Sequence, residues 1–417
     1  MTGRRRFLHS LSTGIAAPLF APAATVPAMP TPGDPAYWSK IRDQFLLARD
    51  KVFFNNGTIG AMPRVVFERT VDHLRKMATD IADWDYNPNN EWIAGYGPHL
   101  DIRTKAATLL HCKPNELALT ENVTEAMNYL ANGLTVEPGS DILITDQEHP
   151  GGQCPWLNAA SRHHATVVQM RVPKPVESPA EAMQAFYNAV TPRTRILAIS
   201  HVITGAGSIL PVKQICAEAK TRGIFTILDG AQAFGHIKVD LEDIGCDAYV
   251  GCFHKWMLAP AGTGFFFVRE NRAREVATTL ASTHWNDQAD AGYRFSQRGT
   301  GSLSLLMGLD AALDFHNAIG AQRVQERIKY LGDYLRDGLR KMPGVRLYTS
   351  SHAEMSAGIT VYSVDGVTGP QLQAEMWNRA RLRPRANGAG VRHSTHIFNS
   401  PQEIDKALGV VRALAKG

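Results

Sequence analysis

Residues Thr226–Gly264 read TILDGAQAFGHIKVDLEDIGCDAYVGCFHKWMLAPAGTG. This stretch sets Asp229 at the end of an apolar strand and Lys255, 26 residues later, inside a turn bracketed by glycines. A lysine amine can form a Schiff base with an aldehyde, and a carboxylate can keep a pyridine nitrogen protonated. An aspartate after a strand is often a turn residue and a lysine is usually solvated. The two residues together, and neither alone, therefore predict a site for pyridoxal phosphate.

The wider pattern supports this prediction. The groups D-G-A-Q, G-C-D and H-K-W followed by A-P-x-G-x-G resemble the class V aminotransferase family, to which cysteine desulfurases, kynureninase and isopenicillin N epimerase belong. The resemblance extends from about Lys51 to the C-terminus. It implies that Lys255 is the Schiff-base lysine, that His254 contacts the coenzyme phosphate, and that Gln232 donates a hydrogen bond to the phenolic oxygen of the ring.

A phosphate cradle is expected upstream, in the segment LTENVTEAMNYLANGL. It is typical of a strand end, a turn and an amphipathic helix that begins near Thr124. A helix start offers unpaired N–H groups and the positive end of the helix dipole. We therefore expect the amide of Val123 and the hydroxyl of Thr124 to bind phosphate. The alternative is that Thr124 is an ordinary N-cap with Glu125 in the first turn.

Two further segments carry ring and substrate contacts by the same resemblance. In DILITDQEHPGGQCPW, His149 takes the position of a histidine that lies on the face of the pyridine ring; otherwise it would be a surface histidine. After Ser200-His201-Val202, desulfurases usually have an asparagine that meets the substrate, and this chain has Thr204. Asn56 lies in a predicted loop, residues 55–60, near the substrate.

The chain departs from the desulfurase pattern beside the lysine. Cys252 stands where desulfurases have a phosphate-binding serine, and a thiol is a weak donor. Another donor is implied by SQRGTGSLS, because a Gly-Thr at this place in the family reaches across a dimer interface to the neighbour's phosphate. Thr300 is thus expected to serve a partner subunit in a homodimer. The simpler alternative is a turn threonine.

The segment GVRHSTHIFNSPQEID resembles the family's arginine strand and the helix after it. The family's arginine binds the substrate α-carboxylate through two parallel hydrogen bonds, which a lysine cannot reproduce. Arg392 is the candidate. We expect Arg381, Arg383 and Arg385 to be surface charges, with one of them able to reach the substrate.

The reaction is harder to predict than the coenzyme. Lys255 can move a proton at the substrate α-carbon, a step common to racemases, transaminases and several lyases. No cysteine follows Cys252, so a desulfurase route through a mobile thiol is disfavoured and the isopenicillin N epimerase-like branch is favoured. A desulfurase-like or C–S lyase-like enzyme and a non-catalytic binding protein remain alternatives. The chain has no G-x-G-x-x-G after an early strand and no G-K-[ST] loop, so a nucleotide enzyme is not indicated.

Composition agrees with a two-domain enzyme. The chain has 417 residues, of which 44% are hydrophobic, enough for a large core. Its formal net charge is +5, and three of these charges are Arg4, Arg5 and Arg6. The remainder gives no reason to expect nucleic acid. The five cysteines have neither a disulfide framework nor metal-ligand spacing, so we expect no metal.

The N-terminus indicates export. GRRRFLHSLSTGIAAPLFAPAA has a basic start, a mildly apolar middle and small residues, which is typical of a cleavable signal and not of a membrane span. Arg4-Arg5-Arg6-Phe7-Leu8 resembles a twin-arginine signal, so we expect the twin-arginine translocase to carry the folded protein to the periplasm. The alternative is a disordered basic tail.

Alternation of apolar strands and helices predicts an α/β fold. We expect residues 1–30 to be the signal and linker. Residues 31–300 should form a large domain around a mainly parallel sheet with helices on both faces, the fold type I that the resemblance implies. Residues 301–417 should form a smaller α+β domain. Ligands of such sheets bind at the carboxyl ends of the strands, where Asp229 and His149 would project.

Overall fold

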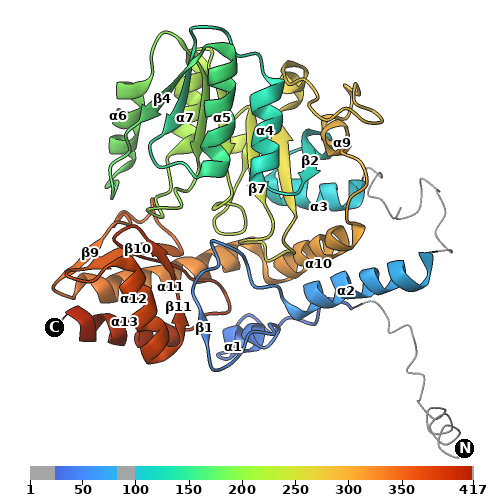
Figure 1. Cartoon of the computed structure of the whole chain (residues 1–417). Helices are drawn as coiled ribbons and strands as arrows, with labels where there is room; N and C mark the ends of the chain where they lie inside the picture. Colours follow the sequence, from blue (N-terminus) through green and yellow to red (C-terminus); the bar gives the residue numbers. More distant parts are fainter. Residues whose placement is uncertain (1–23, 82–98, 416–417) are drawn as a thin grey trace, which may run out of the picture.

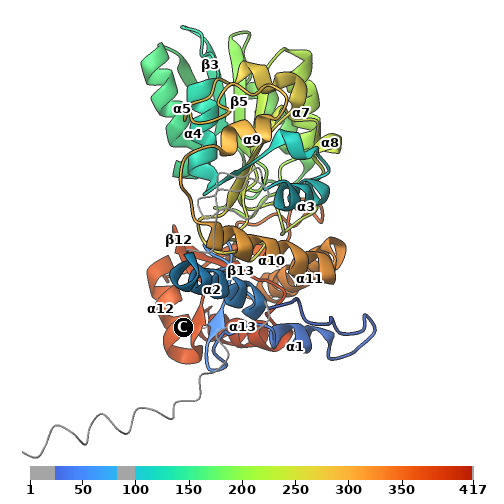
Figure 2. The ribbon, with the colours of Figure 1, turned by 90° about the vertical axis from the view of Figure 1, so that its right-hand side faces the viewer.

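The computed structural model describes residues 24–81 and 99–415. The expected signal therefore lies almost wholly outside the described residues. A large sheet with its helices lies above a smaller sheet with its own helices (Figure 1). In the view turned by 90°, the long helix α10 (Leu303–Ile319) lies between these two layers, and α2 (Arg64–Thr79) packs against it (Figure 2). No described helix has both the length and the apolar character needed to cross a membrane.

The large sheet has seven strands in the order β2-β8-β7-β6-β5-β3-β4. Their bounds are β2 Leu117–Thr120, β3 Asp141–Thr145, β4 Thr166–Met170, β5 Thr194–Ser200, β6 Phe225–Asp229, β7 Ala248–Cys252 and β8 Gly264–Val268. Every neighbouring pair is parallel except those that include β8, which runs antiparallel to β2 and β7. The expected mainly parallel sheet is confirmed.

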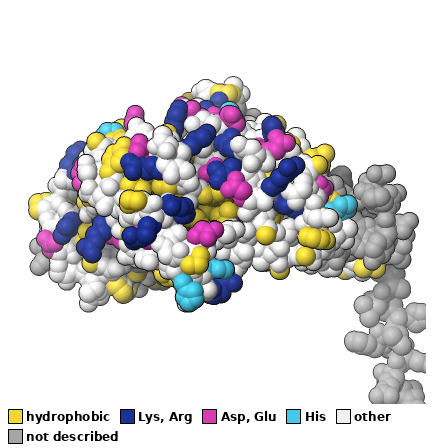
Figure 3. Space-filling view, turned by 90° about the horizontal axis from the view of Figure 1, so that it is seen from above, with side chains coloured by type: hydrophobic (Ala, Val, Ile, Leu, Met, Phe, Trp, Pro, Cys, Tyr) yellow, Lys and Arg dark blue, Asp and Glu magenta, His cyan; other side chains and the backbone are white. Residues whose placement is uncertain are grey.

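Helices cover both faces of this sheet, as the near-continuous apolar runs of its strands require. In β3, Ile142 and Ile144 pack into one core with α4, α5 and α9, whereas Leu143 between them packs into another with α3, α6, α7 and α8. The bounds are α3 Leu100–Leu110, α4 Val123–Gly133, α5 Pro150–His163, α6 Pro179–Ala189, α7 Val212–Thr221, α8 Leu241–Ile244 and α9 Ala291–Ser296, with 3-10 turns at Pro114–Glu116 and Glu270–Glu275. From above, basic and acidic side chains are interspersed over this end of the molecule (Figure 3).

The smaller sheet is antiparallel, in the order β12-β13-β10-β9. Its strands are β9 Val345–Leu347, β10 Ile359–Val364, β12 Arg385–Asn387 and β13 Gly390–Ser394, and its helices are α11 Ala321–Arg340, α12 Gly369–Ala380 and α13 Pro401–Ala415. Leu331, Leu372 and Ile404, one from each helix, share a core with Tyr362 of β10. This region has the α+β character expected for the C-terminal part of the chain.

The N-terminal segment crosses over to this smaller unit. The helix expected near residues 34–44 is α1, Tyr37–Arg42. Strand β1, Val52–Phe53, pairs in parallel with β11, Leu382–Arg383, and Phe54 enters the core of the smaller unit. The domain division at residue 300 stays a prediction. Loop 55–60 is thereby held between the two sheets, beside the ends of the large sheet's strands.

Candidate active site

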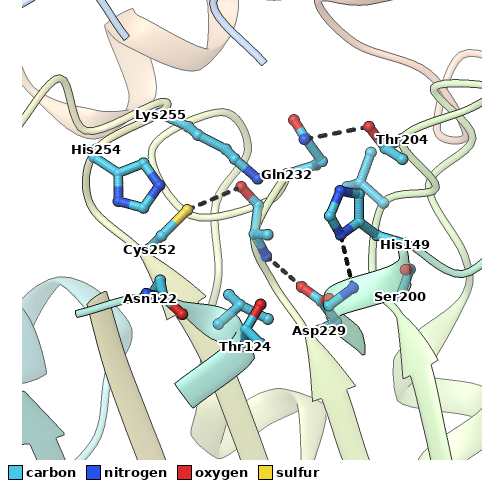
Figure 4. Close-up of a pocket in the computed structure, with 14 residues that line it drawn as sticks. Asn122, Thr124, His149, Ser200, Thr204, Asp229, Gln232, Cys252, His254 and Lys255 are labelled. Atoms are coloured by element: carbon cyan, nitrogen blue, oxygen red, sulfur yellow. Dashed lines mark hydrogen bonds between the residues drawn. The ribbon is translucent and has the colours of Figure 1, made fainter. Parts of the chain in front are cut away.

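A cavity lies where the parallel strands of the large sheet end (Figure 4). It is lined by Asn122, Val123, Thr124, His149, Gly151, Ser200, Val202, Thr204, Asp229, Ala231, Gln232, Cys252, His254 and Lys255. These residues come from the ends of β5, β6 and β7 and from the starts of α4 and α5. Eight of the eleven site residues expected from the sequence are therefore brought together; Arg392, Asn56 and Thr300 are not among the lining residues.

Asp229 is the last residue of β6 and is 5% exposed. Its Oδ1 accepts a hydrogen bond from the Ala231 amide at 2.8 Å. A Cβ built on Gly152 would lie 3.0 Å from Oδ2, so glycine at this helix position keeps that oxygen uncrowded. Burial raises the pKa of Asp229, whereas the Ala231 amide and the charges of Lys255 and His149 oppose the rise. A cationic ring nitrogen beside Oδ2 would favour the carboxylate further.

A second carboxylate, which the sequence reasoning left without a role, lies close to Asp229. Glu148 accepts hydrogen bonds from Thr145 Oγ1 at 2.6 Å, from the Ser200 amide at 2.9 Å and from Ser200 Oγ at 2.5 Å. Burial raises the pKa of Glu148 to about 7. The charge of Asp229 adds to this rise, whereas the hydrogen bonds from Ser200 and Thr145 oppose it. Glu148 ties the ends of β3 and β5 together behind the cavity. Its adjacency to His149 was the only sequence signal for it.

The turn that carries Lys255 is attached to loop 55–60. The Gly60 amide donates to the His254 carbonyl at 2.8 Å, and Asn56 Nδ2 donates to the Lys255 carbonyl at 3.1 Å. A Cβ on Gly60 would lie 2.1 Å from that Lys255 oxygen, which no side chain permits. Asn56 is fully buried and supports the lysine turn from behind; a substrate contact by Asn56 stays a prediction.

Helix α4 points its first turn at the cavity. It begins at Val123, one residue before the expected start, and its N-cap is Asn122, whose Oδ1 accepts from the Glu125 amide at 3.0 Å. Thr124 is therefore not the N-cap, so the alternative reading of this threonine is wrong. Val123 and Thr124 both line the cavity, and the first-turn amides and the hydroxyl can serve an anion there.

His254 and Cys252 complete this end of the cavity. Because the Thr263 carbonyl can only accept, His254 Nδ1–H donates to it at 3.0 Å. Burial lowers the pKa of His254, the Thr263 carbonyl opposes this, and Lys255 lowers the pKa further. Cys252 Sγ donates to the Ala231 carbonyl at 3.7 Å, and burial raises the pKa of its thiol to about 11. Cys252 is thus a neutral thiol and not a nucleophile.

His149 is the N-cap of α5, and its Nδ1 accepts from the Gly151 amide at 3.1 Å. A neutral ring therefore carries its proton on Nε2. Burial lowers the pKa of His149; the charges of Lys255, Arg385 and Arg392 lower it further, and Asp229 opposes them. The ring lies in the cavity beside Asp229 in Figure 4, which is compatible with the expected contact to a ring face.

The orientation of the Gln232 amide is set by its neighbours. Trp256 Nε1 donates to Gln232 Oε1 at 2.9 Å, so the oxygen is fixed and Nε2 faces the other way. Nε2 donates to the Gly57 carbonyl at 2.8 Å and, at the longer distance of 3.3 Å, to Thr204 Oγ1. The N–H that makes the longer bond to Thr204 can instead donate to a phenolic oxygen, as expected for Gln232. Trp256 was not predicted as a site residue and acts here as a positioning residue.

Trp256→Phe tests this arrangement. Loss of the indole N–H should let the amide rotate, so we expect a roughly three- to tenfold loss in kcat/KM, the worth of one hydrogen bond. The pH dependence of the coenzyme's visible absorption should shift as well. The matched control is Trp156→Phe, because the buried Trp156 indole nitrogen has no hydrogen-bond partner among the described residues. Equal spectra and rates in both variants would remove Trp256 from this role.

Arg392 lies directly behind Thr204, on β13, and is 4% exposed. Its Nη1 donates to Thr204 Oγ1 at 2.6 Å, and its Nη2 donates to Thr58 Oγ1 at 2.9 Å and Asn55 Oδ1 at 3.1 Å. Burial lowers the pKa of Arg392 to about 10, and the charge of Arg385 adds to this. Across the described ranges no carboxylate pairs with Arg392, and its Nε has no partner. A buried guanidinium with neutral partners only is suited to an incoming anion.

Thr300 lies outside the cavity, exposed, in the segment between α9 and α10. Its role toward a partner subunit stays a prediction. Among residues 24–81 and 99–415, no cluster of three or more His, Cys, Asp or Glu side chains is placed to hold a metal ion.

Comparison with known proteins decides the family. The profile of the family described as Aminotransferase class-V matches residues 52–406. The chain belongs to the class V aminotransferase family. Its cofactor is pyridoxal phosphate, as expected from Asp229 and Lys255.

Relatives within the family have different activities. Isopenicillin N epimerase of Streptomyces clavuligerus is 31% identical over 91% of this chain and 98% of its own. A probable cysteine desulfurase of Xylella fastidiosa is 28% identical over 84% and 85%. Two structures of the cystine C–S lyase C-DES match with TM-scores of 0.78 and 0.77 at 24% and 25% identity, covering 89% and 88% of this chain and 99% and 98% of theirs. One has glycine covalently linked to the pyridoxal phosphate cofactor, and the other holds cysteine persulfide.

The donors around the cavity fit this cofactor. Lys255 offers an amine for the aldehyde, Oδ2 of Asp229 is an uncrowded acceptor for the ring nitrogen, and the first turn of α4 offers amides for the phosphate. When bound, pyridoxal phosphate withdraws electrons from the α-carbon of an attached amine. Around it, Lys255, Asp229 and the first turn of α4 are the groups of this chain that would hold the cofactor.

Proposed function

We propose that this enzyme moves a proton at the α-carbon of an amino acid, or of the amino-acid part of a peptide, in an epimerase- or aminotransferase-like reaction. The observation that carries the proposal is Arg392, a buried guanidinium that has no acidic partner in the described part of the chain and that touches the cavity through Thr204. A carboxylate bound there would direct the neighbouring amine and α-carbon into the cavity lined by Lys255. The similarity to isopenicillin N epimerase supports this reaction class.

A C–S bond-cleaving activity is the second candidate, supported by the similarity to desulfurases and to a cystine C–S lyase. Cys252 argues against the desulfurase form, because its thiol is neutral, hydrogen-bonded to Ala231 and the last cysteine of the chain. A lyase that eliminates from the β-carbon needs no protein thiol, so it stays the alternative. A non-catalytic binding protein is disfavoured by the presence of both Lys255 and Asp229.

Export and assembly are also part of the proposal. The basic leader with Arg4, Arg5 and Arg6 supports export of the folded, loaded enzyme by the twin-arginine translocase to the periplasm. The Gly299-Thr300 pair supports a homodimer in which Thr300 reaches the partner's phosphate. Both would be tested together by fractionating cells and measuring the mass of the exported protein in solution.

The experiment that separates the two reactions uses holoenzyme in D₂O with a panel of amino acids and amino-terminal dipeptides. Mass spectrometry should show deuterium at the α-carbon, and chiral chromatography should show inversion or conversion to the keto acid. Release of sulfide or persulfide from cysteine or cystine, without exchange in other amino acids, would establish the lyase alternative and overturn the proposal.

Arg392→Lys should lower kcat/KM at least about tenfold while the coenzyme spectrum stays unchanged. Lysine cannot make two parallel bonds to a carboxylate, and a hydrogen bond to a charged group contributes roughly 1.5–3 kcal/mol. The variant should also discriminate less between the free acid and its α-amide. If the wild-type enzyme processes the α-amide as well as the acid, Arg392 is not a carboxylate clamp.

A further inference from the structure

Arg392 is paired across the smaller sheet with a second arginine. In the antiparallel register of β12 and β13, Arg385 lies directly opposite Arg392. Like charges directly opposite one another destabilise a sheet. Across residues 24–81 and 99–415, neither guanidinium forms an ion pair with a carboxylate, although the chain forms many such pairs elsewhere. The repulsion between these two opposed guanidiniums destabilises the hairpin, and an anionic ligand would reduce it.

The two guanidiniums share one hydrogen-bond acceptor. Thr58 Oγ1 accepts from Arg392 Nη2 at 2.9 Å and from Arg385 Nη1 at 3.1 Å. Thr58 belongs to the loop whose Gly60 amide is bonded to His254, beside Lys255. Arg385 and Arg392 are, in addition, both close enough to His149 for their charges to act on its ring. Arg385 is exposed, as expected of a surface charge, and its guanidinium is bonded to the same loop as that of Arg392.

The neighbouring arginines differ from Arg385. The guanidinium of Arg383 stacks on the Trp377 ring with its carbon 4.1 Å from the ring centroid, and that of Arg381 lies 5.3 Å from the same centroid. These two side chains cover an aromatic ring on α12 and fit the expectation of surface charge. Only Arg385, among the three, is bonded to loop 55–60.

The two arginines also differ in depth. Arg392 is buried behind Thr204, whereas Arg385 is exposed at the solvent side of Thr58. A single carboxylate bound by Arg392 offsets one of the two positive charges. The second charge then lies farther out, where the remainder of a substrate held by its α-carboxylate would extend.

We propose that the substrate is dianionic: Arg392 binds its α-carboxylate, and Arg385 binds a second carboxylate on its side chain. The substrate class is thus an acidic α-amino acid, or a peptide-like molecule with an acidic group at that distance. This inference rests on the proposed function, since it takes the α-carboxylate to lie at Arg392. It assigns Arg385 as the residue that determines specificity for the distal group.

The test compares aspartate, glutamate and 2-aminoadipate with their ω-amides, for α-deuterium exchange by holoenzyme. For at least one chain length the acid should be preferred over its amide by about tenfold or more in kcat/KM. Arg385→Gln should bring that ratio close to one, and Arg385→Lys should restore part of it. Arg383→Gln is the matched control, because it removes the same charge two residues away and should leave the ratio unchanged.

Binding gives an independent readout without turnover. Calorimetry of the holoenzyme should show tighter binding of glutarate or adipate than of the matching monocarboxylates, and Arg385→Gln should abolish the difference. Exchange that is equally fast with acids and amides at every length, with equal binding of mono- and dicarboxylates, would overturn the dianion inference alone. If no amino acid exchanges its α-proton, the proposed function fails instead, whatever the calorimetry shows.

Discussion

Lys255→Ala is expected to lose turnover by roughly 10⁴-fold or more. This is the upper end of what a positioned proton-transfer group contributes, and the same amine also provides the covalent attachment to the cofactor. The purified wild-type protein should be yellow, and borohydride should fix the cofactor on Lys255. The variant should still bind the cofactor, more weakly, because Asp229, the first turn of α4 and His254 remain.

Lys174→Ala is a suitable control for Lys255→Ala. Lys174 is another lysine, which lies over the Tyr348 ring at 5.6 Å and does not line the cavity. Its loss should leave borohydride labelling of Lys255 intact. Peptide mapping that finds the label on a different lysine, or on none, would show that the central assignment is wrong.

The large sheet could be predicted because its signals are local. Apolar runs such as ILIT and TILD are short, bounded by turn residues and followed by helical patterns, and each became a strand with both faces covered. The crossing of β1 to β11 could not be predicted in the same way. Its partners are about 330 residues apart in the chain, and a two-residue strand has no periodicity of its own.

The candidate site shows the same difference between residues with local sequence signals and residues without them. Lys255 and Asp229 were predicted from residue type and spacing, Thr124 from a helix start, and Gln232 and His149 from the family resemblance. All five line the cavity. The residues that support them were not predicted. Trp256 orients the Gln232 amide through a hydrogen bond that forms only in the folded turn, and Glu148 connects the ends of two strands.

Contacts between segments far apart in the sequence could not be predicted from local sequence patterns. Asn56 meets the Lys255 carbonyl across 199 residues, a support for the lysine turn that the sequence pattern did not indicate. The pairing of Arg385 with Arg392 depends on the register of a hairpin that the sequence reasoning did not anticipate. Thr300 would act across a subunit boundary, so a single chain cannot test it.

Asp229→Ala should lower kcat at least about a hundredfold, on the scale of a lost electrostatic group in a water-poor site. Without the carboxylate, the ring nitrogen would deprotonate and the cofactor would withdraw electrons less strongly. Burial raises the pKa of Asp229, and a cationic ring nitrogen beside the carboxylate would oppose this rise. The measurement is α-deuterium exchange, with the cofactor's visible band followed in parallel.

Two further variants separate charge from shape in this prediction. Asp229→Asn keeps the volume and the bond from the Ala231 amide, so it should lose about as much rate as alanine only if the charge is what matters. Asp146→Asn is the control, because Asp146 also follows a strand of the same sheet. It accepts from the Val172 amide at 3.1 Å and lies outside the cavity lining, so its replacement should leave the rate unchanged. Near-normal exchange in Asp229→Ala would exclude this carboxylate from the chemistry.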